Sequence, residues 1–265
     1  MRLYHFLNER YGLEDLREKR LKIGRIVELN DPFEFIGVDL SDPRFRKSME
    51  KTKKDLSEKV GVLCFSKNWN DPVQWAHYAD GHKGLCLGFD IPDHILAEVN
   101  YVDERLPVDD FVAKQKAFGD KLVGEMDDYI GLPASRDEFE TKKKAFIEMT
   151  TERWRREAES ATEPEIDTES KALMMKILRT KFSHWSYEKE CRVFLLLENQ
   201  EINGFRYANF SDELKLKEVI VGVRSCVTRT KIEDALGEMT GSVDVFKVRP
   251  DFRAFVVVKD QNNAF

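Results

Sequence analysis

Short apolar runs near both ends of the chain have the length and the flanking turn residues that are typical of β-strands. The clearest is Val60–Ser66, which is almost continuously apolar and therefore predicts a strand buried on both faces. The run that begins at Arg192 has a similar character. Strands are expected at residues 3–7, 21–26, 60–66, 84–90, 192–197, 205–210, 219–223, 243–248 and 252–259, the last two as a hairpin.

Apolar residues in the middle of the chain, from Val108 to Phe182, instead recur at the three- and four-residue spacing of helices. Shorter helices are expected at residues 44–59 and 73–79, and Thr230 with Glu233 suits a capping box that opens another. Because strands cluster at both ends and helices gather in the middle, the pattern predicts one α+β domain over residues 1–265 with a helical insertion at residues 108–182.

Composition narrows the range of partners. The formal net charge of −6 argues against broad, non-specific binding of nucleic acid and against attachment to an anionic membrane. The four cysteines have no CxxC spacing and lie in or next to apolar runs, which is typical of buried, reduced thiols. The first residues lack an apolar signal-peptide region, and no apolar run is long enough to cross a bilayer. A soluble, cytoplasmic protein is therefore expected.

Charged residues stand at the entrance of one predicted strand. Glu188, Glu190 and Arg192 would share one face of an extended chain, since side chains alternate with period two. Two carboxylates and a guanidinium at the start of a buried strand are costly unless they pair with one another or with a ligand. They predict either a structural ion pair or a site in which a glutamate stabilises positive charge developing on a substrate sugar.

A second group of polar and aromatic residues runs from Trp75 to Gly84. On a helix, Trp75 and Tyr78 would share a face while His77 projects elsewhere. His77 and His82 are five residues apart, a spacing that does not bring two imidazoles together, so no metal site is expected. The chain also lacks a GxSxG elbow, a P-loop and a GxGxxG fingerprint, which argues against serine hydrolases, kinases and Rossmann enzymes.

Five short motifs, in order along the chain, resemble those of a bacterial family of unknown function whose members are often seen beside phage-defence and abortive-infection genes. The motifs are Leu3-Tyr4-His5, Asn30-Asp31-Pro32-Phe33-Glu34, Trp75-Ala76-His77-Tyr78-Ala79, His82-Lys83-Gly84 and Trp185-Ser186-Tyr187-Glu188-Lys189-Glu190-Cys191-Arg192. The resemblance spans most of the chain and implies a role in defence, together with a partner protein from a defence locus.

A more distant likeness is to the ADP-ribosyltransferase superfamily, particularly the toxins that modify nucleic acid. It implies a bent, split β-sheet core that clamps NAD as a substrate. Under this likeness His5 would bond the ribose or adenosine part of NAD, and Glu190 would stabilise the oxocarbenium ion as nicotinamide leaves. Glu188 is the alternative catalytic carboxylate. The residues that would bind NAD are Ser66, Trp75, His77, Tyr78 and Arg192.

Three functions remain open on these grounds. The first is an NAD-consuming transferase or glycohydrolase that acts as a phage-defence or toxin effector on nucleic acid or protein. The second is a metal-independent ribonuclease toxin that uses His5, His77 or His184 as acid and base, with Arg192 on the phosphate. The third is a non-enzymatic module that senses or binds a ligand, in which the charged cluster is structural.

Overall fold

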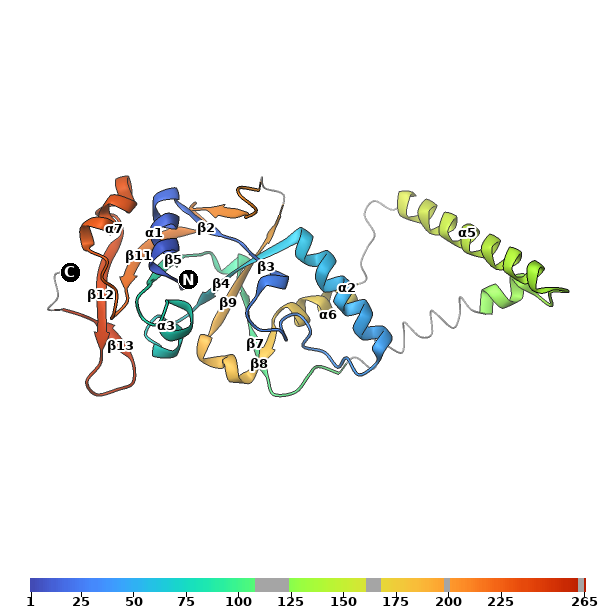
Figure 1. The fold of residues 1–265 in the computed structure, drawn as a ribbon, viewed down its shortest axis with the longest axis horizontal. Coiled ribbons are helices and arrows are strands. Elements are labelled where there is room, and N and C mark those ends of the chain that lie inside the picture. The colour runs from blue at the N-terminus through green and yellow to red at the C-terminus, as the bar shows by residue number, and fades with distance from the viewer. Residues whose placement is uncertain (108–123, 161–167, 198–200, 262–264) are drawn as a thin grey trace. The chain divides into compact units, whose positions relative to one another are not determined.

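The computed structural model describes residues 1–107, 124–160, 168–197, 201–261 and 265 (Figure 1). The chain divides into two compact units. Unit 1 comprises Met1–Gly37, Arg46–Glu104 and Arg179–Phe265, and unit 2 comprises Val38–Phe45 and Arg105–Leu178. The chain as a whole is of the α+β class, as the strand and helix pattern predicts.

Unit 1 is built on one mixed β-sheet in the order β13-β12-β11-β5-β1-β4-β9-β6, with β3 also pairing with β4. Neighbouring strands are antiparallel, except that β11 and β12 are parallel. The strands are β1 (Arg2–Leu7), β3 (Gly24–Arg25), β4 (Val60–Ser66), β5 (Leu85–Asp90), β6 (Ala97–Glu98), β9 (Glu190–Leu196), β11 (Lys215–Val221), β12 (Asp244–Pro250) and β13 (Val257–Lys259).

Helices cover both faces of this sheet. On one face, α1 (Glu9–Glu18) and α7 (Arg229–Leu236) pack together over the larger apolar core (Figure 1). On the other face, α3 (Pro72–Tyr78) contributes Trp75 to a smaller core with Cys86 and Phe246. The alternation along β5 explains both cores, because Leu85, Leu87 and Phe89 face α1 and α7 while Cys86 faces α3.

The sheet is nearly interrupted between β1 and β4. These strands share a single residue pair, Tyr4 with Ser66, whereas β4 pairs with β9 over its whole length. Beyond that pair a side chain takes the place of a ladder hydrogen bond, because Nδ1 of His5 lies 2.8 Å from the carbonyl oxygen of Cys64. The gap between the two strands provides room for a cavity within the sheet.

Smaller elements refine the expectations from the sequence. The segment 21–26 is not one strand: it divides between β2 (Arg20–Lys22), β3 and the 3-10 helix η1 (Ile26–Glu28). The capping box at Thr230 is also wrong, because α7 begins at Arg229 and the hydroxyl of Thr228 caps it by accepting from the backbone NH of Lys231. The remaining pairs are β2 with β10 (Tyr207–Asn209), and β7 (Asn100–Val102) with β8 (Thr180–Phe182).

Two long helices of the middle block, α5 (Arg136–Ser160) and α6 (Thr168–Leu178), belong to unit 2. Residues 124–130 are helical too, and the ring of Tyr129 packs on that of Phe146 with centroids 5.7 Å apart. The predicted insertion ran to residue 182, but its last residues form strand β8 in unit 1. Parts of it, residues 108–123 and 161–167, lie outside the described residues. Helix α2 (Pro43–Lys59) matches the exposed helix expected at residues 44–59.

Candidate active site

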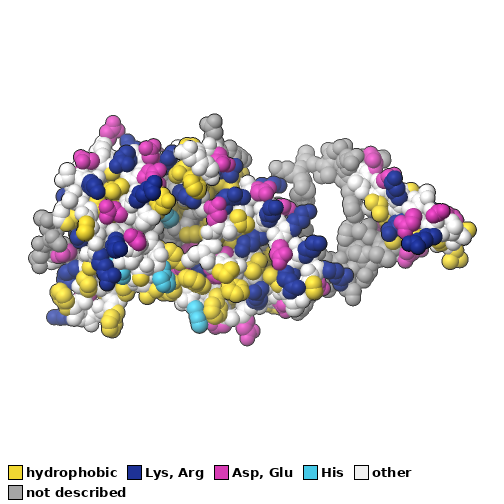
Figure 2. Space-filling view, in the orientation of Figure 1, with side chains coloured by type: hydrophobic (Ala, Val, Ile, Leu, Met, Phe, Trp, Pro, Cys, Tyr) yellow, Lys and Arg dark blue, Asp and Glu magenta, His cyan; other side chains and the backbone are white. Residues whose placement is uncertain are grey.

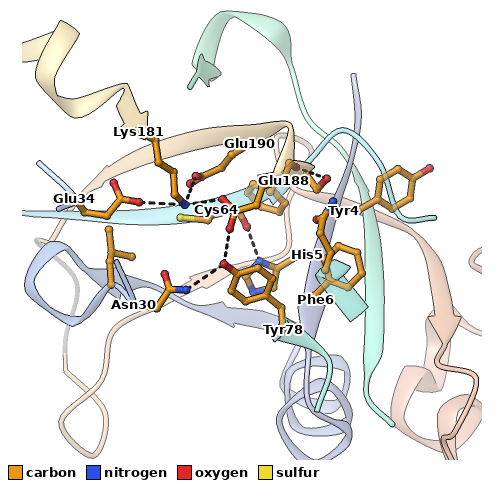
Figure 3. A pocket seen from close by; sticks show the side chains of 14 residues that line it. Tyr4, His5, Phe6, Asn30, Glu34, Cys64, Tyr78, Lys181, Glu188 and Glu190 are labelled. Atoms are coloured by element: carbon orange, nitrogen blue, oxygen red, sulfur yellow. Dashed lines mark hydrogen bonds and ion pairs between the residues drawn. The ribbon is translucent and has the colours of Figure 1, made fainter. Parts of the chain in front are cut away.

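A cavity of about 180 Å³ lies at the gap between β1 and β4 (Figure 3). Its walls come from five segments of unit 1 that are far apart in the sequence. Ligand pockets for drug-sized molecules typically measure roughly 300–1,000 Å³, so this cavity suits one ring or one sugar. It is lined by Tyr4, His5, Phe6, Leu29, Asn30, Glu34, Cys64, Phe65, Ser66, Gln74, Tyr78, Lys181, Glu188 and Glu190.

Lys181 is the centre of a buried ionic cluster at one side of the cavity. Its ammonium lies 2.6 Å from Oε2 of Glu188, 3.0 Å from Oε2 of Glu190 and 3.2 Å from Oε1 of Glu34. All four side chains are buried, and Figure 3 shows the three carboxylates converging on Nζ. Burial alone would lower the pKa of Lys181, but the three carboxylates outweigh burial and raise it. The three carboxylates therefore favour the protonated form of the lysine.

Arg192 forms the second cation of the cluster and lies behind Glu190. Its side chain is 0% exposed, and its Nε donates to Oε1 of Glu190 at 2.8 Å while Nη2 donates to Oε2 of the same carboxylate at 3.1 Å. Nη2 also donates to both carboxylate oxygens of Glu34 at 2.8 Å. This forked geometry is the one that arginine makes best with carboxylates, and it fixes the position of Glu190.

The pKa values of Glu188 and Glu190 are shifted in opposite directions. Burial opposes the ionisation of Glu190, yet Arg192 and Lys181 outweigh it and lower its pKa to about 2. For Glu188 burial dominates over Lys181 and Tyr78, so its pKa is raised. A pair of carboxyl groups with diverging pKa values is the arrangement by which one site separates a fixed charge from a proton-handling group.

Tyr78 links the cluster to the open side of the cavity. It is the last residue of α3, and its hydroxyl donates to Oε1 of Glu188 and accepts from Nδ2 of Asn30 at 3.1 Å (Figure 3). Burial and the bond to Glu188 raise the pKa of Tyr78, which keeps the phenol protonated. The chain that follows the helix passes close to β1 at Gly84, where a Cβ would lie 2.0 Å from the carbonyl oxygen of Leu7 and only glycine fits.

His5 supplies a neutral imidazole to the same cavity. Since a carbonyl oxygen only accepts, the bond to Cys64 places the proton on Nδ1 and leaves Nε2 as an acceptor. Burial lowers the pKa of His5 despite the carbonyl, which favours the neutral form. Nε2 makes no hydrogen bond within the described part of the chain, so it is available to a ligand hydroxyl.

The other residues expected at the site have different surroundings. Ser66 lines the cavity, but its hydroxyl donates to the backbone carbonyl of Glu188 at 2.6 Å and thus positions that residue. Trp75 does not line the cavity: it is 0% exposed and donates to the carbonyl of Trp69 at 2.6 Å. His77 lies outside the cavity, with Nδ1 3.0 Å from the hydroxyl of Tyr187. Of Trp75, His77 and Tyr78 on α3, only Tyr78 lines the cavity.

Sequence reasoning did not identify Lys181 or Glu34 as site residues. Glu34 belongs to one of the five motifs, and Lys181 lies near the end of the predicted helical insertion. One signal was present: a strand entrance with two glutamates and one arginine leaves a carboxylate unmatched, so a further cation was required. No periodic pattern singles out Lys181 as that cation, because its contact with Glu34 joins segments that are far apart in the sequence.

Among the described residues, no group of three or more His, Cys, Asp or Glu side chains is arranged to hold a metal ion. In the same residues no helix is both long and apolar enough to cross a membrane.

Comparison with known proteins finds a partial match to a family whose function is unknown. No curated protein matches the chain, and no solved structure matches it. A family model described as "Protein of unknown function (DUF2971)" matches residues 74–193, which is less than half of the chain. The matched segment begins in α3 and ends in β9, so it includes Tyr78, Lys181 and both glutamates but neither His5 nor Glu34. Over this segment the chain is similar to a family of unknown function.

Proposed function

We propose that the cavity is the active site of an NAD-consuming enzyme similar to the ADP-ribosyltransferases. One observation carries the proposal: two adjacent carboxyl groups with opposite pKa shifts, Glu188 and Glu190, line one small cavity together with a phenol and a neutral imidazole. Transfer at the sugar carbon of an N-glycoside requires a fixed negative charge close to the carbon that becomes positive. The interrupted pairing of β1 and β4, where the cavity lies, also suits the split sheet of that superfamily.

The reaction breaks the bond between C1′ of the nicotinamide ribose and the ring nitrogen. Both bonding electrons pass to the pyridinium nitrogen, so nicotinamide leaves as a neutral molecule and the positive charge shifts to the ribose oxocarbenium ion. Glu190, held ionised by Arg192 and Lys181, would stabilise that charge. Water or an acceptor hydroxyl or amine then bonds to C1′ and loses a proton.

Glu188 is the group suited to take that proton. Its raised pKa brings it towards the working pH, which is where a general base is most effective. Tyr78 and Lys181 hold its two oxygens, so the carboxyl group is oriented before a ligand arrives. His5, with a free Nε2, would accept a hydrogen bond from a ribose hydroxyl, and Tyr78 would border the nicotinamide ring.

The biological setting follows from the family resemblance. An effector of this kind would act in the cytoplasm as a phage-defence or toxin protein and would modify nucleic acid or a protein target. Acidic and basic side chains are interspersed over the face of unit 1 that Figure 2 shows. This mixture favours an acceptor chosen by local contacts over one drawn by a broad basic surface.

The test is release of nicotinamide from NAD by the purified chain, followed by chromatography with and without candidate acceptors. Wild type is expected to release nicotinamide, and Glu188→Gln to lower the rate by roughly 100-fold or more, because loss of a general base typically costs 10²–10⁴. Below the pKa of Glu188 the wild-type rate should fall as the base becomes protonated, and this acid limb should be absent from the variant. Equal rates in the two proteins would refute the role of Glu188.

A binding module without turnover is the second candidate. It is favoured by the complete engagement of Glu190, whose two oxygens already bond Arg192 and Lys181. Such a module would bind NAD, nicotinamide or ADP-ribose and raise the melting temperature without releasing nicotinamide. The ribonuclease reading has less support, since neither His77 nor His184 lines the cavity that contains His5.

A further inference from the structure

A second, wider hollow adjoins the cavity on the side of α3. It has a volume of about 810 Å³ and lies between the start of α1, the end of α3 and α7. All of its walls belong to unit 1. The residues that line it include Arg10, Tyr11, His77, Tyr78, Asp80 and Lys231.

Tyr78 is part of the wall of both spaces. Its hydroxyl reaches Glu188 inside the small cavity, while its side chain also borders the hollow. The two spaces are therefore neighbours that share Tyr78 as a wall residue. A ligand whose reacting sugar occupied the small cavity would extend past Tyr78 into the hollow.

The volumes of the two spaces also fit a ligand that occupies both of them. The inner cavity, at about 180 Å³, is too small for a dinucleotide, whereas the hollow falls within the range typical of ligand sites, roughly 300–1,000 Å³. A ligand that fills both spaces would have a small reacting group and a larger remote part. Binding energy from such a remote part typically serves to hold the reacting group in position.

Side chains in the hollow suit a nucleotide phosphate and base. The guanidinium of Arg10 lies over the ring of Tyr11, with Cζ 5.6 Å from the ring centroid, and it makes no ion pair within the described residues, so its N–H groups suit a phosphate. Lys231 is only loosely paired, with Nζ 4.0 Å from Oε1 of Glu9. Tyr11 is 52% exposed and offers a ring face for stacking, and Asp80 adds a carboxylate that suits sugar hydroxyls.

We infer that the hollow binds the phosphate and adenosine end of a dinucleotide whose nicotinamide ribose occupies the inner cavity. This inference rests on the proposed function and extends it by assigning Arg10, Tyr11 and Lys231 to substrate binding. None of the three lines the inner cavity, so they contact the remote part of the ligand only.

The experiment compares two substrates of different length, NAD and nicotinamide riboside, which lacks phosphate and adenosine. The double variant Arg10→Ala/Lys231→Ala is expected to raise KM for NAD about tenfold or more, which corresponds to about 1.4 kcal/mol, and to leave kcat/KM for nicotinamide riboside within about twofold. Arg17→Ala is the matched control, because Arg17 lies two turns further along the same face of α1 and does not border the hollow. Arg17→Ala should leave KM for NAD and kcat/KM for nicotinamide riboside unchanged.

An equal effect of the double variant on both substrates, or no effect on either, would overturn the inference. If neither substrate is turned over, the proposed function fails, and calorimetric binding of ADP-ribose then decides the inference separately. Binding by wild type that the double variant weakens about tenfold would support a nucleotide site in the hollow. Absence of binding to wild type, or equal binding to both proteins, would overturn it.

Discussion

Arg192→Met is expected to lower the free energy of unfolding by about 3–5 kcal/mol, because it would leave the buried carboxylates of Glu34 and Glu190 without their guanidinium. Removing one member of a buried ion pair costs far more than the pair contributes, since the remaining charge has lost both its partner and its water. Lys181 alone would face three carboxylates. Urea unfolding of wild type and variant at neutral pH measures the difference.

Arg2→Met is the matched control. Arg2 also pairs with two carboxylates, those of Asp90 and Glu218, but its side chain is 32% exposed. Partly exposed pairs of this kind contribute little, so a loss of about 1 kcal/mol or less is expected. If Arg192→Met proves too unstable to purify, the double variant Arg192→Met/Glu190→Gln should recover part of the loss. If Arg2→Met and Arg192→Met lower the free energy of unfolding by similar amounts, the claim that burial makes the loss of Arg192 costly would be wrong.

Glu190→Gln is expected to be costly at neutral pH, whereas Glu188→Gln is expected to leave stability nearly unchanged. The pKa of Glu190 falls from an ordinary 4.5 to about 2 on folding, which corresponds to about 3 kcal/mol. A lowered pKa in the folded state gives stability that is fully present above the unfolded value and is lost as the pH falls through the folded value. Wild type should therefore lose this contribution between about pH 5 and pH 2.

Urea unfolding at several pH values from 3 to 7 measures this contribution. The free energy of unfolding of Glu190→Gln should decline less steeply towards acid than that of wild type. Glu188→Gln serves as the control, because burial raises the pKa of Glu188 and an amide of the same size loses little there. Parallel pH profiles for wild type and Glu190→Gln would show that Glu190 is not the carboxylate held ionised by folding.

Local patterns predicted much of the sheet. Val60–Ser66 forms β4 with the expected bounds, and the strand after residue 190 pairs with it along its whole length. Period-two alternation also placed Glu188, Glu190 and Arg192 together, and in the structure all three are buried in one cluster. The details differ, since Glu188 ends the 3-10 helix η3 (Ser183–Glu188) and Lys189 turns the chain with φ of 46° before β9 begins.

Contacts between distant segments account for what the sequence did not predict. Glu34 reaches Arg192 across 158 residues of chain, and it also meets Lys181, whose other two carboxylates, Glu188 and Glu190, follow it closely in the sequence. Neither contact has a periodic signature, so no pattern along the chain could identify it. For Trp75 a local pattern was present but did not predict the position of the side chain. Helical spacing places Trp75 and Tyr78 on one face, but the indole of Trp75 is buried in the smaller core, whereas Tyr78 ends the helix at the cavity.

A crystal structure of the Glu188→Gln variant with NAD would show directly whether the cavity is the active site, because the variant is expected to bind the substrate without consuming it. We expect the nicotinamide ribose in the small cavity, between His5, Tyr78 and Glu190, with C1′ facing the carboxylate of Glu190. NAD bound at another place, or a cavity that stays empty at concentrations at which wild type releases nicotinamide, would contradict it.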